Sequence, residues 1–171
     1  IAPLVPGEVN KKNLILGDIC YEKILNIKPR IALLNEQAFS SNLIQLYLEQ
    51  GYEAIIMEWN NCFDANKDWN SELQYNFQIA TNTLKKYQIK IIWNNSISFQ
   101  KFQRYVHGEN TLQEHVDYLS CHSDNEIRSF PLYGNDAEIF DFRPGRFTTE
   151  SLIMKEGEWK RIDNLIKSIS N

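Results

Sequence analysis

The chain has 171 residues, 43% of them hydrophobic, and a formal net charge of −4, so we expect residues 1–171 to form a single α/β domain with a buried core. The acidic balance argues against nucleic acid and membrane as partners, because anionic surfaces attract a basic face, and no apolar run is long enough to span a bilayer. Three widely separated cysteines indicate reduced thiols, and with no signal-peptide pattern we expect a cytoplasmic protein.

Along the chain, predicted strands and helices alternate. Strands are expected where short runs are rich in β-branched and bulky residues, and helices where apolar residues recur at helical spacing. In chain order, the predicted elements are a short strand at 14–16 in an otherwise weakly patterned start, a strand at 31–34, a helix at 40–51, a strand at 54–57, a loop at 60–70, a helix at 72–87, a strand at 89–92, helices at 96–106 and 111–122, a strand at 129–133 and a helix at 158–169. Gly51 and Gly108 are expected at helix ends, and Thr111 with Glu114 predicts a capping box. This order predicts a parallel sheet with crossover helices.

The four longer predicted strands each lead into acidic or amide side chains. In parallel α/β folds, ligands and catalytic groups collect at the carboxyl ends of the strands. We therefore expect Glu36, Glu58, Asn94 and Asp136 to lie on one rim. Four or five strands cannot close a barrel of seven or eight, so the sheet is either open or half of a larger barrel. Because the chain starts at Ile1 rather than Met, we expect the N-terminal strands of that barrel to be missing.

The carboxylates of this rim have two interpretations each. Glu36 and Glu58 can act as a nucleophile or base at the mouth of the sheet, or they can cap the next helix or pair with an arginine at the rim. Asp136 and Glu138 alternate within an apolar segment, where one carboxyl pKa should rise and suit a general acid; the alternative is a solvated loop. Arg143 can neutralise these acids or hold an anionic group, and a salt bridge is its favoured role.

Two tryptophans also lie at the ends of predicted strands. Trp59 and Trp93 lie beside amides such as Asn94, which suits sugars because a sugar offers an apolar face and an edge of hydroxyls. Core packing is the competing interpretation. His107 and His115 do not have the spacing of a metal motif, and we expect neither a metal nor an organic cofactor.

Two segments resemble glycoside hydrolase family 57. Residues 35–40, Asn-Glu-Gln-Ala-Phe-Ser, followed by a helix and the strand to Glu58, resemble the nucleophile region of that family. Residues 134–140, Gly-Asn-Asp-Ala-Glu-Ile-Phe, resemble its later motif, Asp-x-Glu-Leu-Phe-Gly-His. The chain departs from the family where Asn35 replaces the usual proline, and where residues 141–145 replace the Gly-His-aromatic continuation.

The resemblance implies a glycoside hydrolase or transglycosylase that acts on α-glycosidic bonds by a retaining, two-carboxylate mechanism. Glu36 would be the nucleophile and Asp136 the general acid/base. The residues expected to bind the oligosaccharide or polysaccharide substrate are Glu58, Trp59, Trp93, Asn94, Glu138 and Arg143. The implied fold is an incomplete, seven-stranded parallel (β/α) barrel, in which this chain is the C-terminal part and its missing N-terminal part is a partner. A metal-dependent polysaccharide deacetylase on the related barrel, which would use His107 and His115, and a non-catalytic glycan-binding protein of polysaccharide assembly are the alternatives.

Overall fold

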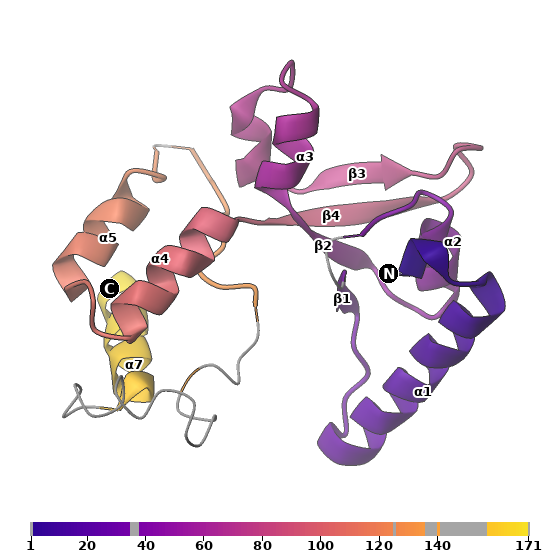
Figure 1. Cartoon of the computed structure of the whole chain (residues 1–171), viewed down its shortest axis with the longest axis horizontal. Helices are drawn as coiled ribbons and strands as arrows, with labels where there is room; N and C mark the ends of the chain where they lie inside the picture. The colour runs from indigo at the N-terminus through magenta and orange to yellow at the C-terminus, as the bar shows by residue number, and fades with distance from the viewer. Residues whose placement is uncertain (1, 35–37, 125, 136–139, 141–156, 171) are drawn as a thin grey trace. The chain divides into compact units, whose positions relative to one another are not determined.

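The computed structural model of the chain describes residues 2–34, 38–124, 126–135, 140 and 157–170. The chain divides into two compact units, Ile1–Asn94 and Asn95–Asn171. The first unit holds a sheet with helices, and the second unit is helical in the residues described (Figure 1). Among these residues, no helix has the length and apolar character needed to cross a membrane.

The first unit is built on a four-stranded sheet. In chain order its elements are η1 (Ala2–Leu4), α1 (Gly7–Leu25), β1 (Ile31–Leu33), α2 (Leu43–Glu49), β2 (Ala54–Glu58), α3 (Trp59–Ala65), η3 (Ser71–Tyr75), β3 (Gln78–Thr81) and β4 (Gln88–Asn94). The strand order is β1-β2-β4-β3, and β1, β2 and β4 run parallel, whereas β3 is antiparallel to β4. Helix α2 connects β1 to β2, which gives the βαβ unit that the sequence predicted.

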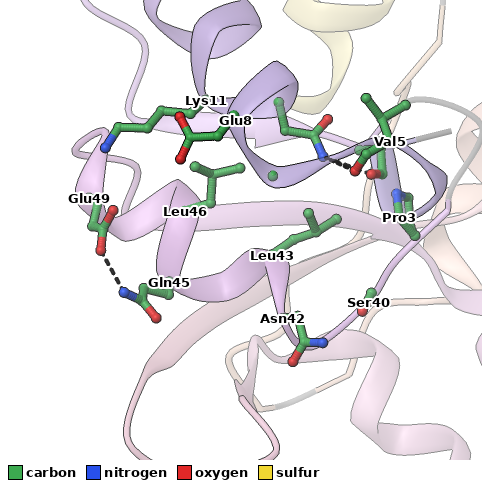
Figure 2. A pocket seen from close by; sticks show the side chains of 13 residues that line it. Pro3, Val5, Glu8, Lys11, Ser40, Asn42, Leu43, Gln45, Leu46 and Glu49 are labelled. Atoms are coloured by element: carbon green, nitrogen blue, oxygen red, sulfur yellow. Dashed lines mark hydrogen bonds between the residues drawn. The ribbon is translucent and has the colours of Figure 1, made fainter.

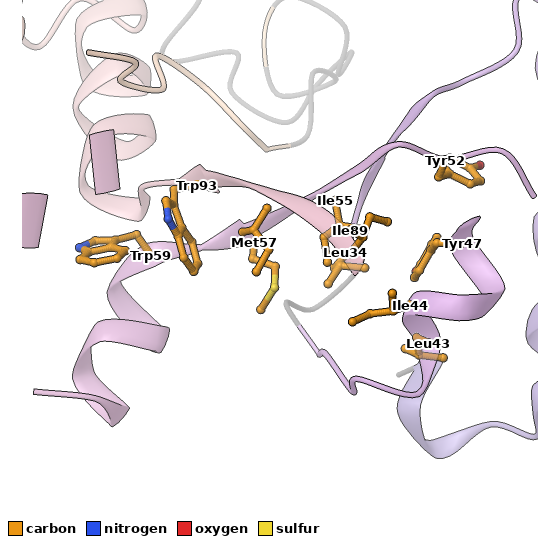
Figure 3. Close-up of a cluster of buried hydrophobic side chains, with 11 residues drawn as sticks. Leu34, Leu43, Ile44, Tyr47, Tyr52, Ile55, Met57, Trp59, Ile89 and Trp93 are labelled. Carbon is orange, nitrogen blue, oxygen red and sulfur yellow. The ribbon is translucent and has the colours of Figure 1, made fainter. Parts of the chain in front are cut away.

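The two faces of this sheet differ. Along β4, Ile89, Ile91 and Trp93 are buried, whereas Lys90 and Ile92 between them are exposed, because successive side chains of a strand point to opposite faces. The buried face packs against α2, where Ile44 is fully buried, and against α3. Figure 3 shows this core extending from Tyr47 and Tyr52 at one end to Trp59 and Trp93 at the other.

A buried hydrogen bond joins α1 to the start of β2. The Tyr52 hydroxyl donates to Asp18 Oδ1 at 2.9 Å, and both residues are buried. Burial, together with the hydrogen bond to the Asp18 carboxylate, raises the pKa of Tyr52 to about 12. The phenol donates this hydrogen bond at physiological pH and links α1 to the start of β2.

Among its described residues, the second unit packs three helices around an aromatic core. They are α4 (Ser96–Val106), α5 (Leu112–Ser120) and α7 (Glu158–Ile169). Phe102, Tyr105 and Val106 of α4 and Leu165 of α7 are all at most 4% exposed. Arg161 fastens α7 to α4, because Nε donates to the Tyr105 carbonyl at 2.8 Å and the guanidinium lies 4.5 Å above the Tyr105 ring.

Several predicted elements are confirmed. The three parallel strands occur within a residue or two of the predicted runs, and so does the helix at 158–169. Thr111 and Glu114 form the predicted capping box at the start of α5. Gly51 and Gly108 follow helix ends with φ values of 89° and 86°, a left-handed region that glycine adopts without a steric penalty.

Four predictions of secondary structure were wrong. Residues 7–25 form helix α1 instead of a weakly patterned start with a short strand, and the predicted loop at 60–70 begins as helix α3. The predicted helix at 72–87 is a 3-10 turn followed by β3 and a turn, in which Asn82 Oδ1 accepts from the Lys86 and Tyr87 amides. Residues 129–133 are not a strand; their Pro131 carbonyl accepts a hydrogen bond from Ser98.

Candidate functional site

Two of the predicted site residues are neighbours at the carboxyl ends of parallel strands. Glu58 ends β2 and Asn94 ends β4, and the two residues are paired in the register of the sheet. They are 4% and 2% exposed. Since they alternate with Met57 and Trp93, they lie on the face opposite the helix-covered core. A carboxylate and an amide at this position can accept and donate hydrogen bonds to the hydroxyls of a ligand.

Glu58 also has a local structural role. It is the N-cap residue of α3, and its Oε1 accepts from the Asn60 backbone amide at 3.4 Å. The helix-capping interpretation of this residue is therefore confirmed, while its contact with substrate stays a prediction. Glu58 also acts on a side chain of α3. The pKa of the Cys62 thiol is raised, first by burial and then by the negative charge of Glu58.

Trp59 and Trp93 are packed in the core of the first unit. They are 3% and 5% exposed, and their ring centroids are 5.2 Å apart with the rings near perpendicular. Phe63 stacks on Trp59 at 5.2 Å. The packing interpretation describes both residues here, and sugar contact by either one stays a prediction. Trp69, which the sequence did not single out, contacts both rings and is 36% exposed; the signal for it was the Asn-, Asp- and Trp-rich composition of residues 60–70.

The remaining site predictions lie outside the described residues. They are Glu36, Asp136, Glu138 and Arg143. Glu36 follows β1 closely in the sequence, and β1 is parallel to β2, which ends on Glu58. Of the four residues predicted on this rim, the structure describes the two that end β2 and β4.

The two histidines that a deacetylase would use each contact other side chains of the second unit. His107 Nδ1 lies 2.6 Å from Glu158 Oε1, an interaction that joins the end of α4 to the start of α7. His115 is 1% exposed and its ring is stacked on Tyr105, with the centroids 5.3 Å apart. Within the described residues, no three His, Cys, Asp or Glu side chains are grouped so that they could hold a metal ion.

A pocket of about 360 Å³ lies between the start of the chain and α2, as Figure 2 shows. Structural hydrogen bonds hold its walls: Asn10 Nδ2 donates to the Ala2 and Val5 carbonyls, and Gln45 Nε2 donates to Glu49 Oε1 at 2.6 Å. Of the site candidates that the structure describes, none lines this pocket. The pocket is thus distinct from the rim at Glu58 and Asn94.

Comparison with known proteins identifies a family and a similar solved structure. The family model of glycosyl hydrolase family 57 matches residues 1–155. The fold is similar to that in the crystal structure of 4-α-glucanotransferase from Thermococcus litoralis, with a TM-score of 0.72 and 17% sequence identity. The similarity covers 98% of this chain and 24% of that chain, so this chain spans about a quarter of that protein's length. No curated protein matches the sequence.

Proposed function

The chain belongs to glycosyl hydrolase family 57, and we propose that it is part of an enzyme that cleaves or transfers α-glycosidic bonds with retention of configuration. The observation that carries this proposal is the family match over residues 1–155, which includes both Glu36 and Asp136. The likeness to a 4-α-glucanotransferase fold supports an α-linked glucan as the substrate class.

In the proposed mechanism, Glu36 attacks the anomeric carbon while Asp136 protonates the leaving glycosidic oxygen. The covalent glycosyl-enzyme intermediate is then resolved when Asp136 removes a proton from water or from the hydroxyl of an acceptor sugar. A retaining pair of this kind needs its carboxyl groups about 5–5.5 Å apart. Glu58 and Asn94, which are paired at the ends of β2 and β4, would bind sugar hydroxyls beside this pair.

The chain is also proposed to be the C-terminal part of an incomplete (β/α) barrel. Two features of the first unit support this. Within the described residues of this unit, the helices that pack on the parallel strands β1, β2 and β4 lie on one face, although parallel sheets are normally covered on both. On the other face, the paired residues Leu33, Ile56 and Ile92 form an apolar row.

The mechanism is tested with Glu36→Gln and Asp136→Asn in the full-length protein. On a maltooligosaccharide, we expect Glu36→Gln to lower kcat by more than about 10⁴-fold and Asp136→Asn by about 10²–10⁴-fold. On a nitrophenyl α-glycoside, whose leaving group needs no proton, Asp136→Asn should still release one equivalent of nitrophenol in a burst, whereas Glu36→Gln should not.

Glu53→Gln is the matched control, since Glu53 is an exposed carboxylate paired with Arg30 at the opposite end of β2. It should keep wild-type turnover. Full turnover in either Glu36→Gln or Asp136→Asn would show that the assignment is wrong.

A non-catalytic, glycan-binding protein is the second candidate, because the chain departs from the family's motifs at Asn35 and at residues 141–145. That function predicts glycan binding by the wild-type protein with no turnover. The kinetic experiment separates the two candidates directly.

A further inference from the structure

The loop after α3 holds a partly exposed indole against two buried ones. Trp69 is 36% exposed, whereas Trp59 and Trp93 are 3% and 5% exposed. The ring centroid of Trp69 lies 6.1 Å from that of Trp59 and 6.3 Å from that of Trp93. From this arrangement we propose that Trp69 is a stacking platform for a sugar ring of an α-linked glucan. The inference rests on the proposed carbohydrate function and adds a binding residue to it.

The position of Trp69 in the fold brings it near the edge where ligands bind. Trp59 is the residue directly after β2, and Trp93 is the next-to-last residue of β4. A ring that touches both therefore stands close to the carboxyl ends of two parallel strands. Glu58 and Asn94 end the same two strands, with their side chains on the other face of the sheet.

The buried indoles hold the Trp69 ring in place. Trp59 is itself fixed by Phe63, which stacks on it with a centroid separation of 5.2 Å, and by Trp93 at the same separation. A ring that is already ordered by its neighbours loses little conformational entropy when a ligand stacks on it. Such preorganisation makes a supported indole a better platform than an aromatic residue on a free loop.

Polar residues flank Trp69 in the sequence. Asp68 and Asn70 precede and follow Trp69, and both are exposed. A sugar combines an apolar face of C–H groups with an edge of hydroxyls, so a partly exposed indole suits the apolar face.

Binding of maltoheptaose by the full-length protein carrying Glu36→Gln tests this proposal by calorimetry. We expect Trp69→Ala to raise the Kd at least about tenfold, as is typical of a tryptophan at the centre of an interface. Trp69→Phe keeps a ring and should raise the Kd less. Tyr21→Ala is the control, since Tyr21 is a 49% exposed aromatic residue on α1, and it should leave the Kd unchanged.

Two further readouts separate ligand contact from a structural role. With Glu36 intact, Trp69→Ala should raise KM for maltoheptaose and leave kcat within about twofold, because the ring binds ground state and transition state alike. Thermal unfolding of Trp69→Phe should match that of the parent protein. An unchanged Kd in Trp69→Ala, or a parent protein that does not bind maltoheptaose, would overturn the proposal.

The outcomes distinguish this inference from the proposed mechanism. If Glu36→Gln and Asp136→Asn abolish turnover but Trp69→Ala binds maltoheptaose normally, the platform is wrong and the mechanism stands. If Glu36→Gln and Asp136→Asn turn over substrate normally but Trp69→Ala no longer binds maltoheptaose, the mechanism is wrong and the platform stands.

Discussion

Glu58 illustrates how one side chain can be fixed by local structure before it meets a ligand. It ends β2 and caps α3 through the Asn60 amide, which orders its carboxylate. Its neighbour Asn94 is 2% exposed and ends the adjacent strand. The capping hydrogen bond orders the Glu58 carboxylate at the end of β2 independently of any ligand. A capping role and a binding role are therefore compatible in the same residue.

His115 should make the stability of the protein depend on pH. It is 1% exposed, and its two ring nitrogens have no hydrogen-bond partner among the described residues. Burial and then the charge of Lys101 lower its pKa below the usual value. In the unfolded chain the imidazole titrates near pH 6.5, whereas the fold holds it neutral to lower pH. The free energy of unfolding therefore keeps its full value above about pH 6.5, and it decreases as the pH falls below that, by up to about 1.4 kcal/mol per pH unit.

The groups around His115 determine which variant can test the pH dependence of stability. Phe102 and Tyr105 of α4 and Tyr118 of its own helix contact its ring, and Lys101 is the nearby charge. His115→Phe keeps the aromatic stacking and removes the titration. Urea unfolding at pH 7.5 and 5.5 should show a smaller loss of stability for this variant than for wild type. Equal losses in the two proteins would show that the imidazole is not held neutral in the fold.

At the scale of elements, the sequence predicted each strand or helix that a single local sequence pattern defines. The three parallel strands are runs of apolar residues, and α5 begins with a capping box. Helix α1 was missed because exposed apolar residues such as Val9, Leu16 and Ile24 leave no single apolar stripe. The antiparallel β3 was missed because its pairing with β4 depends on the turn that Asn82 closes, a local hydrogen-bonded feature with no period in the sequence.

The site was predictable to a similar extent. Polar residues at strand ends pointed to Glu58 and Asn94, and the structure confirms that they are neighbours. Trp59 and Trp93 were found by the same rule with core packing as the alternative, and the choice between the two interpretations depends on Phe63 and Trp69 from the segment after β2. Contacts between side chains of different elements cannot be derived from spacing along one strand.

The attachment of α7 to α4 should depend on the guanidinium group of Arg161. It donates to the carbonyls of Tyr105 and Asn110 and stacks on the Tyr105 ring, whose hydroxyl donates back to the Arg161 carbonyl. Lysine cannot make both hydrogen bonds and the planar stack. We expect Arg161→Lys to lower the free energy of unfolding by about 2 kcal/mol, measured by urea denaturation.

Lys167→Gln on the same helix is the control for Arg161→Lys. It removes an exposed ion pair with Asp163, which should change stability by less than about 0.5 kcal/mol. If Arg161→Lys were as stable as this control, the proposed attachment would contribute nothing to folding.

For the whole molecule, the open face of the sheet is the feature that most needs an explanation. Leu33 and Ile92 are 44% and 37% exposed and lie in one row with Ile56. Strand β1 pairs with β2 on one side, and over the described residues no strand pairs with its other side. An apolar row and an unpaired edge on a parallel sheet are the features that a larger barrel would cover.

The proposed barrel therefore predicts that Ile92 is buried in the full-length protein. If it is, Ile92→Lys places a charge in an apolar interior and should lower the free energy of unfolding by at least about 3 kcal/mol. Gln88→Lys is the matched control, because Gln88 is exposed on the same face at the other end of β4 and should tolerate the charge within about 0.5 kcal/mol. Denaturant unfolding of the two full-length variants measures both effects. Equal stability of the two would mean that this face stays open to solvent, and a barrel completed on that side would then be wrong.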